Sequence, residues 1–173
     1  MYYCSVYNSP VGKLTIASNE DSIVGLWIDK QRYYMDVLSG KDYKEQETQA
    51  IYLAKNWLDK YFNNKRPETS ELPIEFIGSD FRKQVWEILT EIPYGSVITY
   101  GDIANRLAAK RGIKTMSAQA VGGAVGRNPI SVIVPCHRVI GANGSLTGYS
   151  GGLEIKKKLL DHEGVKLSAQ PNN

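Results

Sequence analysis

The first 28 residues alternate between apolar and polar positions in short runs. Turn signals at Ser9-Pro10 and at residues 19–21 separate these runs. The pattern predicts three short strands, over residues 3–7, 13–17 and 23–28. After a polar stretch, apolar side chains recur at helical spacing over residues 48–62, which predicts a helix. With a linker of little regular pattern at 63–78, residues 1–78 are expected to form a small α/β unit.

Helical spacing dominates the rest of the chain. The pattern predicts four helices, over residues 80–92, 100–109, 117–126 and 153–163. We expect Asp80 to cap the first helix and Ser117 the third, because short polar side chains accept the free N–H groups there. In the last helix the apolar side chains should face inward (Leu153, Ile155, Leu159 and Leu160), with the lysines 156–158 partly outward. Two helices joined by a short loop in this region resemble a helix-turn-helix, a signal that many non-binding helix pairs share.

The third of these helices is built almost entirely from small residues. A glycine inside a helix costs about 0.8–1.0 kcal/mol relative to alanine, so Gly122 and Gly123 weaken it. Close approach of another backbone is the benefit that explains such glycines. Either a neighbouring helix or a nucleic-acid groove could make that approach. Gln119 is the one long polar side chain near the start of the helix.

The apolar run 130–134 leads through Pro135 directly to Cys136. β-branched residues followed by proline predict a buried strand that ends abruptly, because proline lacks a backbone donor and has a fixed φ. Cys136 should then lie at the edge of a core rather than inside it. That position is suited to a nucleophile.

A nucleophilic cysteine needs a base, because only the thiolate attacks and a free thiol has a pKa of about 8.5. His137 is the obvious base. Adjacent residues on an extended chain point to opposite faces, so a turn or a bridging water must bring the two groups together. Glu163 is one of several carboxylates that could orient the imidazole. The glycine-rich loop 147–152 offers an aromatic face, a hydroxyl and free N–H groups to a planar heterocycle.

Composition narrows the class of protein. The chain is 42% hydrophobic and 23% charged, the balance of a soluble globular protein, and no apolar run approaches the roughly 20 residues of a membrane helix. The N-terminus lacks the pattern of a signal peptide, so we expect a cytoplasmic protein. Two cysteines and two histidines, widely scattered, form no metal motif. Cys4 is expected to be a small buried hydrophobe.

Positive charge is concentrated in the segment that leads to Cys136. Residues 81–138 carry 8 Lys+Arg against 3 Asp+Glu, a net charge of +5, whereas residues 1–80 carry 9 against 12. A basic segment suits an anionic polymer such as DNA, because each neutralised phosphate releases counterions. An ordinary solvated surface has a similar composition, so charge alone leaves both interpretations open.

The run around Cys136 resembles the active-site signature of the O6-alkylguanine-DNA alkyltransferases, or methylated-DNA–protein-cysteine methyltransferases. The matching residues are 133–140, Ile-Val-Pro-Cys-His-Arg-Val-Ile. Further motifs follow the family's order, at residues 92–95 with 97–100, 120–124 with 127–129, 148–152 and 162–164. The resemblance is close from Asp80 to Lys166 and covers residues 1–78 only in general layout.

This resemblance implies a fold of two domains. The N-terminal domain should be α/β, a small ribonuclease H-like sheet plus helix. The C-terminal domain should be mostly α, with a winged helix-turn-helix-like unit that binds DNA and holds the active site. We accordingly expect a support domain over residues 1–78, an alkyltransferase domain over 79–167 and a tail at 168–173.

The resemblance also implies a single-turnover DNA repair enzyme, a methylated-DNA–protein-cysteine S-methyltransferase without cofactor or metal. Its partner is duplex DNA carrying O6-alkylguanine, with O4-alkylthymine as a further candidate. The protein should bind through the minor groove, flip the base out of the stack and keep the alkyl group on Cys136 irreversibly. No membrane and no obligate protein partner are implied, so we expect a monomer.

Each matching position acquires a role from the resemblance. Cys136 is the acceptor, while His137, Glu163 and a water form the relay that makes the thiolate. Asn128 supports the active-site turn, and Tyr100 acts at the target nucleotide. The residues expected to line the base pocket are Val139, Tyr149, Ser150 and Gly151. The residues expected to contact DNA are Tyr100, Ala118, Gln119, Ala120, Gly122, Gly123 and Arg127. Pro135 and Arg138 are expected to hold the turn.

The chain departs from the family pattern at Gln119, where the family usually carries an arginine that fills the gap left by the flipped base. Glutamine keeps length and hydrogen-bonding capacity but loses the charge and the planar guanidinium. We hypothesise that Gln119 still fills the gap but helps flipping less. Two alternative functions remain: a damage recogniser that flips bases without chemistry, which Cys136 disfavours, and a cysteine hydrolase, which the adjacency of Cys136 and His137 disfavours.

Overall fold

The alternating N-terminal residues fold into a four-stranded sheet in the computed structural model, which describes residues 1–167; the predicted tail at 168–173 lies outside the described residues. The three predicted strands are present as antiparallel neighbours, β1 (Tyr2–Ser9), β2 (Gly12–Ser18) and β3 (Ile23–Ile28). A fourth strand, β4 (Tyr43–Glu45), pairs in parallel with β1, so the sheet order is β3-β2-β1-β4. The sequence pattern missed β4 because its three residues are all exposed and show no alternation.

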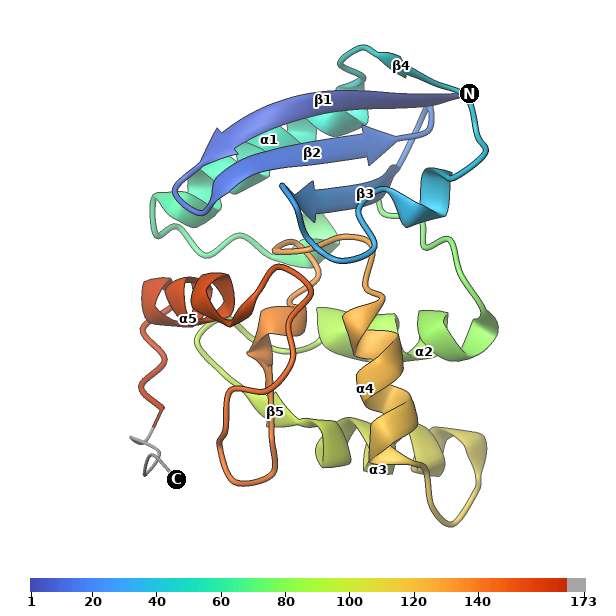
Figure 1. The fold of residues 1–173 in the computed structure, drawn as a ribbon, viewed down its shortest axis with the longest axis vertical. Helices are drawn as coiled ribbons and strands as arrows, with labels where there is room; N and C mark the ends of the chain where they lie inside the picture. Colours follow the sequence, from blue (N-terminus) through green and yellow to red (C-terminus); the bar gives the residue numbers. More distant parts are fainter. Residues whose placement is uncertain (168–173) are drawn as a thin grey trace.

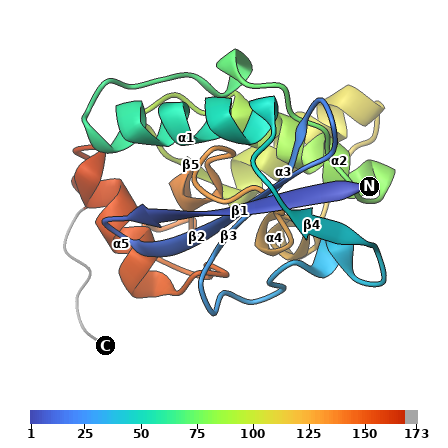
Figure 2. The same cartoon turned by 90° about the horizontal axis from the view of Figure 1, so that it is seen from above.

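The predicted helix of the N-terminal half is confirmed as α1 (Gln49–Phe62). It begins where the Thr48 hydroxyl accepts a hydrogen bond from the Ile51 N–H, a side-chain cap. Figure 2 shows α1 lying along one face of the sheet, and its apolar stripe is buried there. Tyr61 belongs to this stripe and is fully buried near the C-terminal end of the helix.

Three further predicted helices are present as α2 (Asp80–Thr90), α3 (Tyr100–Arg111) and α4 (Ala118–Gly126), the last packing against the other two. Ser117 caps α4 as predicted. The predicted cap Asp80 is wrong by one residue. The Ser79 hydroxyl accepts from the Arg82 N–H, and Asp80 is the first residue of α2. Figure 1 shows these helices gathered below the sheet.

The strand predicted over residues 130–134 is wrong. This segment forms a single bridge, between Ile130 and Leu26 of the edge strand β3, and then runs through turns. Its polar groups bond locally: the Val134 N–H donates to the Ile130 carbonyl, and the Ile133 N–H to the Ser131 carbonyl. The five side chains are buried as expected for a strand. Burial therefore produced the apolar pattern without any ladder of strand pairing.

The remaining elements among residues 1–167 are a small sheet, three short 3-10 helices and the last α-helix. A two-stranded parallel sheet joins β5 (Ile98–Thr99) to β6 (Val139–Ile140), and short 3-10 helices lie at η1 (Asp36–Leu38), η2 (Thr69–Glu71) and η3 (Cys136–Arg138). The last helix, α5, spans Leu153–His162. Two expectations for it are wrong: Leu153 is 48% exposed, and Lys156 is fully buried.

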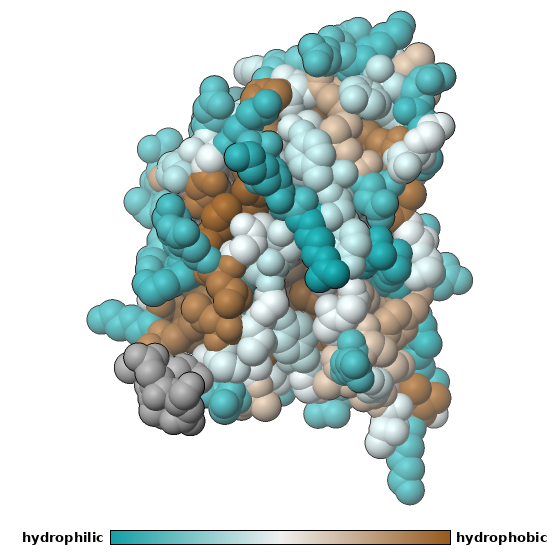
Figure 3. All heavy atoms as spheres, in the orientation of Figure 1, coloured by the Kyte–Doolittle hydropathy of each residue, from teal (hydrophilic) through white to brown (hydrophobic). Residues whose placement is uncertain are grey.

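The hydrophobic core is continuous between the two halves of the chain. One cluster contains Leu14 and Ile16 of the sheet, Trp86 of α2, Val121 of α4 and Leu159 of α5. A smaller cluster around Trp27 covers the other face of the sheet. Figure 3 shows hydrophilic side chains over much of one face, with smaller apolar areas between them. Among residues 1–167 no helix combines the length and the apolar character needed to cross a membrane.

Candidate active site

Cys136 opens the short helix η3, where the chain turns sharply after Pro135. Its side chain is buried, with 3% of the residue exposed, so the thiol lies deeper than the edge position predicted from the sequence. It nevertheless forms part of the wall of a cavity of about 310 Å³. That volume is at the small end of ligand pockets, roughly 300–1,000 Å³.

The wall of this cavity combines elements from both halves of the chain. Tyr149 and Ser150 line it as predicted, whereas Val139 and Gly151 do not. Val139 is fully buried in β6, and a side chain at Gly151 would clash with Ile28 and with the Tyr149 ring. The full lining is Arg32, Tyr33, Tyr100, Gly122, Gly123, Val125, Gly126, Cys136, Gly148, Tyr149 and Ser150.

The cavity residues Arg32 and Tyr33 come from the loop after β3, which the sequence pattern left without a role. The Arg32 N–H donates to the Ser150 carbonyl at 2.9 Å, which attaches this loop to the glycine-rich loop. Arg127, predicted to contact DNA, lies over the Tyr33 ring at 3.6 Å and pairs with Asp36 at 2.8 Å. In this structure Arg127 therefore ties α4 to the N-terminal half.

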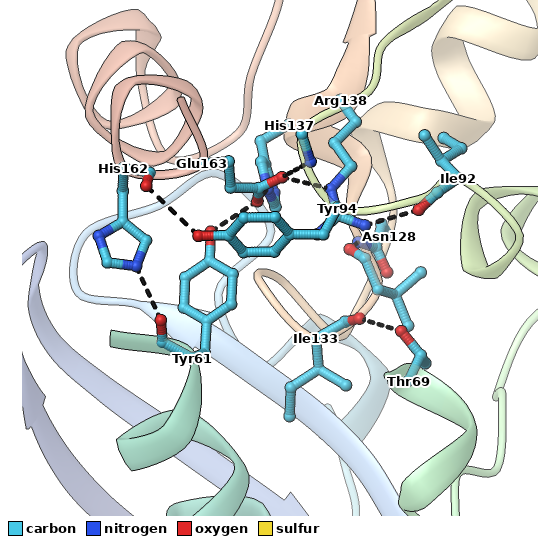
Figure 4. Close-up of polar contacts among 12 residues, drawn as sticks. Tyr61, Thr69, Ile92, Tyr94, Asn128, Ile133, His137, Arg138, His162 and Glu163 are labelled. Carbon is cyan, nitrogen blue, oxygen red and sulfur yellow. Dashed lines mark hydrogen bonds and ion pairs between the residues drawn. The ribbon is translucent and has the colours of Figure 1, made fainter. Parts of the chain in front are cut away.

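His137 and Glu163 form the pair that the sequence predicted. The distance from His137 Nε2 to Glu163 Oε2 is 2.5 Å, and both side chains have no exposed surface. His137 follows Cys136 within the 3-10 turn η3, and Glu163 is the residue directly after α5. Figure 4 shows Glu163 between His137, Arg138 and the hydroxyl of Tyr61.

Glu163 accepts four hydrogen bonds, so its charge is fully compensated. Oε1 accepts from Arg138 Nε at 2.7 Å and from the Gly95 N–H at 3.1 Å, while Oε2 accepts from Tyr61 and His137. Although burial raises the pKa of this carboxyl, the bonds to His137 and Arg138 hold it well below its usual range. Gly95 can approach because it has φ 77° and no side chain.

The ionised carboxylate determines the form of the histidine. Burial lowers the pKa of His137 despite the opposing effect of Glu163, so the imidazole is neutral at pH 7. Because Oε2 can only accept, Nε2 carries the proton, and Nδ1 keeps a free lone pair. Nδ1 is buried and has no hydrogen-bond partner among the described residues. It is the basic atom of the pair that Glu163 does not engage.

The thiol itself is neutral in the free protein. Burial raises the pKa of Cys136 above its usual value, while the Asn128 side chain and the positive charge of Lys156 act in the opposite direction. Cys136 must therefore lose its proton as it reacts. Cys4, by contrast, is buried in the sheet with its pKa raised to about 11, which agrees with its expected role as a hydrophobe.

Asn128 holds the turn that precedes Cys136, as predicted. Its amide donates to the Val134 carbonyl at 2.9 Å, and its carbonyl accepts from the Ile130 N–H at 3.0 Å. Within this turn Val132 has φ 68°, an unfavourable conformation for a β-branched residue that costs about 1–3 kcal/mol. The surrounding hydrogen bonds and burial maintain it, so the position of Cys136 depends on Asn128.

Lys156 is a buried residue of the site that the sequence analysis placed on the surface. Its ammonium donates to the carbonyls of Val139, Thr147 and Gly148, at 2.5, 3.1 and 3.1 Å. Burial lowers its pKa to about 8. The Tyr100 hydroxyl donates to the same Thr147 carbonyl at 2.9 Å. Lys156 and Tyr100 thus hold the loop that carries Tyr149 and Ser150.

The small residues of α4 leave an open surface beside the cavity. Ala118, Gln119, Ala120 and Gly123 are exposed. A methyl group added at Gly123 would meet nothing within 4 Å, so no neighbouring helix explains this glycine. Tight packing within the protein therefore does not explain Gly123. The remaining explanation is close approach by an external surface.

Within residues 1–167 no group of three or more His, Cys, Asp or Glu side chains is arranged to hold a metal ion. The fold and the site define a protein with one buried cysteine thiol in the wall of a small cavity and a histidine–glutamate pair that starts at the next residue. Two family models match the chain: "6-O-methylguanine DNA methyltransferase, ribonuclease-like domain" over residues 2–76, and "6-O-methylguanine DNA methyltransferase, DNA binding domain" over residues 80–165. The chain belongs to the 6-O-methylguanine DNA methyltransferase family.

Individual relatives agree with this assignment. A methylated-DNA–protein-cysteine methyltransferase of Haemophilus influenzae is 38% identical over 94% of this chain and 87% of its own length. The constitutive enzyme of that name from Bacillus subtilis is 37% identical, over 95% and 97%. Among solved structures, Mycobacterium tuberculosis OGT in complex with DNA has a TM-score of 0.78 and 37% identity, covering 94% of this chain and 91% of that one.

Proposed function

We propose that the protein repairs alkylated DNA by transferring the alkyl group from guanine O6 to Cys136. The observation that carries this proposal is the buried Cys136 in a small cavity, next to a neutral histidine paired with Glu163 at 2.5 Å. The family assignment and the DNA complex of the mycobacterial relative support it. The protein is an enzyme of single turnover, because the product is a stable thioether.

The reaction balances without a cofactor. Cys136 loses its thiol proton to His137 Nδ1, directly or through a water, while Glu163 stabilises the imidazolium that forms. The sulfur then bonds to the alkyl carbon as the bond from that carbon to O6 breaks. The electron pair of the broken bond stays on the guanine, which takes up one proton in place of the alkyl group.

Delivery of the base follows from the position of α4. We infer that α4 enters the minor groove of a duplex, where its small exposed side chains permit close contact, and that Gln119 fills the gap left by the flipped base. Tyr100, Tyr149 and Ser150 would then enclose that base beside Cys136. O6-alkylguanine is the proposed lesion, with O4-alkylthymine as a further candidate.

The finer features of the fold are part of the same proposal. The sheet order β3-β2-β1-β4 with α1 on one face supports a ribonuclease H-like N-terminal domain. Helices α3 and α4, flanked by the β5–β6 pair, support a winged helix-turn-helix-like unit. A domain boundary at 78/79, action as a monomer and a cytoplasmic location stay predictions.

The test uses a duplex that contains one O6-methylguanine. After incubation, the mass of the tryptic peptide that holds Cys136 should increase by one methyl group per protein molecule, and a Cys136→Ala variant should show none. Binding of the duplex without the mass increase would favour a damage recogniser instead. Turnover of an ester or amide substrate would favour a hydrolase.

A further inference from the structure

Tyr61 reaches the relay from the other half of the chain. It lies near the end of α1, 102 residues before Glu163, and its hydroxyl donates to Glu163 Oε2 at 2.6 Å. The residue has no exposed surface. Figure 4 shows the phenol pointing from α1 toward Glu163, beside His137. The contact was not expected from the sequence, where Tyr61 was one position of an apolar stripe.

The ring of Tyr61 is fixed on several sides, so the direction of its hydroxyl is fixed as well. Trp57 stacks on it with ring centroids 5.5 Å apart, while Phe62 and Tyr94 contact it edge-on at 5.0 and 5.9 Å. The His162 ring lies at 5.1 Å, and its Nε2 is 2.7 Å from the Tyr61 carbonyl. A hydroxyl held in this way is a pre-oriented donor.

Tyr61 and His137 share one oxygen of Glu163. A hydrogen bond from Tyr61 withdraws negative charge from Oε2, so this atom attracts the His137 proton less strongly than it would alone. Burial raises the pKa of Tyr61 far above its usual value, which keeps the phenol a donor at every working pH. The basicity of Oε2, and through it that of the imidazole, therefore depends on Tyr61.

We propose that Tyr61 is a positioning residue of the relay, through which the N-terminal half orients Glu163 and tunes the basicity of His137. This inference rests on the proposed alkyl transfer and adds to it a role for the N-terminal half beyond support. Tyr61 touches neither the thiol nor the cavity, and it acts only through Glu163.

Several titratable or charged groups surround the Glu163–His137 pair and influence its protonation. Those that face Glu163 or His137 are Tyr61 of α1, Tyr94 between α2 and β5, Cys136 and Arg138 of η3, Tyr149 of the glycine-rich loop and Lys156 of α5. Arg138 and Lys156 are cationic, and both disfavour the imidazolium. Removal of the Tyr61 hydroxyl should leave the other five groups in place.

The experiment compares Tyr61→Phe with Tyr7→Phe in the full chain. Tyr7 donates to the Asp59 carboxylate at 2.6 Å, the same kind of bond from the sheet to an exposed part of α1, so it is a matched control. Single-turnover transfer from an O6-methylguanine duplex is measured from pH 5 to 8. Without its second donor, Oε2 stabilises the imidazolium more, so the acid limb of the Tyr61→Phe profile should move upward by about 0.5–1 pH unit. On that limb, transfer becomes about three- to tenfold slower; Tyr7→Phe should match the wild type.

Two further measurements test the role of Tyr61 without relying on the Tyr61→Phe kinetics alone. Nitrogen NMR of the imidazoles, simplified by the presence of only two histidines, should show an upward shift of the His137 titration in Tyr61→Phe. A difluorotyrosine placed at position 61 keeps the shape and is a stronger donor, so it should move the acid limb downward. If the wild type transfers the alkyl group and the pH profile is unchanged in Tyr61→Phe and in the difluorotyrosine protein, the role of Tyr61 is overturned but the proposed function is not. If the wild type transfers no alkyl group, the proposed function fails, and the His137 titration still decides whether Tyr61 tunes the pair.

Discussion

At the scale of single residues, Lys156 shows how one buried charge can shape a pocket. Its three carbonyl partners belong to β6 and to the start of the glycine-rich loop, so one ammonium joins the strand after Cys136 to the loop that carries Tyr149. Its positive charge also favours the thiolate of Cys136. A buried cation with three oxygen acceptors is compensated locally, which explains why it is tolerated.

A Lys156→Met variant should keep the aliphatic packing and lose the three hydrogen bonds. We expect about 2 kcal/mol of destabilisation and slower transfer, because the carbonyls of the loop lose their donor. Urea unfolding and single-turnover kinetics measure the two effects. The control is Lys157→Met, since Lys157 is exposed and pairs with Asp161, a contact that contributes less than about 0.5 kcal/mol. Equal behaviour of the two variants would contradict the proposed role.

At the scale of elements, α4 is a helix whose composition favours an external contact over its own stability. Its buried side, with Val121, Ala124 and Val125, packs on the rest of the domain. Its other side is exposed and lacks bulky side chains, apart from Gln119. Since Gly123 borders the cavity and has open space around it, the glycine weakens the helix without any packing benefit inside the protein.

A Gly123→Ala variant should therefore change stability and DNA binding in opposite directions. Alanine should stabilise the protein by up to about 1 kcal/mol, because it favours the helix and meets no neighbour. The added methyl group should weaken binding to duplex DNA, because it holds the backbone of α4 away from the groove. Thermal unfolding and fluorescence anisotropy test the two parts. A stabilised variant that binds DNA as tightly as the wild type would exclude groove contact at this position.

At the scale of the whole molecule, Glu163 connects segments that are far apart in sequence. Its carboxylate joins α1 through Tyr61, the segment before β5 through Gly95, and η3 through His137 and Arg138. Arg138 continues this network by donating to the Ile92 carbonyl at 2.6 Å, at the end of α2. The relay of the active site is therefore also a structural junction between the two halves.

Glu163→Gln should lower both transfer and stability, the latter by about 3–5 kcal/mol, because the Arg138 charge loses its buried partner. The pKa of Glu163 is depressed in the folded state, so its contribution is complete above the ordinary value of 4.5 and is lost as the pH falls below it. Wild-type stability should thus decline below about pH 4.5 more steeply than that of Glu163→Gln. Urea unfolding between pH 3 and 7 measures this difference. Glu154→Gln, at an exposed position, is the control and should follow the wild type; equal pH slopes in all three proteins would refute the assignment.

Much of this arrangement could be predicted from local patterns. The spacing of apolar residues predicted β1 to β3 and all five α-helices. The motif at 133–140 pointed to Cys136 and His137, and the motif at 162–164 pointed to Glu163. One further signal was present but overlooked: Lys156, Leu159, Leu160 and Glu163 have the spacing of one helix face, so two buried leucines implied two buried charges beside them. The periodicity therefore indicated that Lys156 and Glu163 are buried.

The sequence by itself determined β1 to β3, the five α-helices and the chemistry of the acceptor, because periodicity and motif depend on neighbouring residues. Only the tertiary structure decided that residues 130–134 form turns, that the loop with Arg32 and Tyr33 closes the cavity, and that Tyr61 bonds Glu163. Burial imposes the same apolar pattern on a buried turn as on a buried strand. A hydrogen bond across 102 residues has no local signature at all, since it exists only once the two halves share one core.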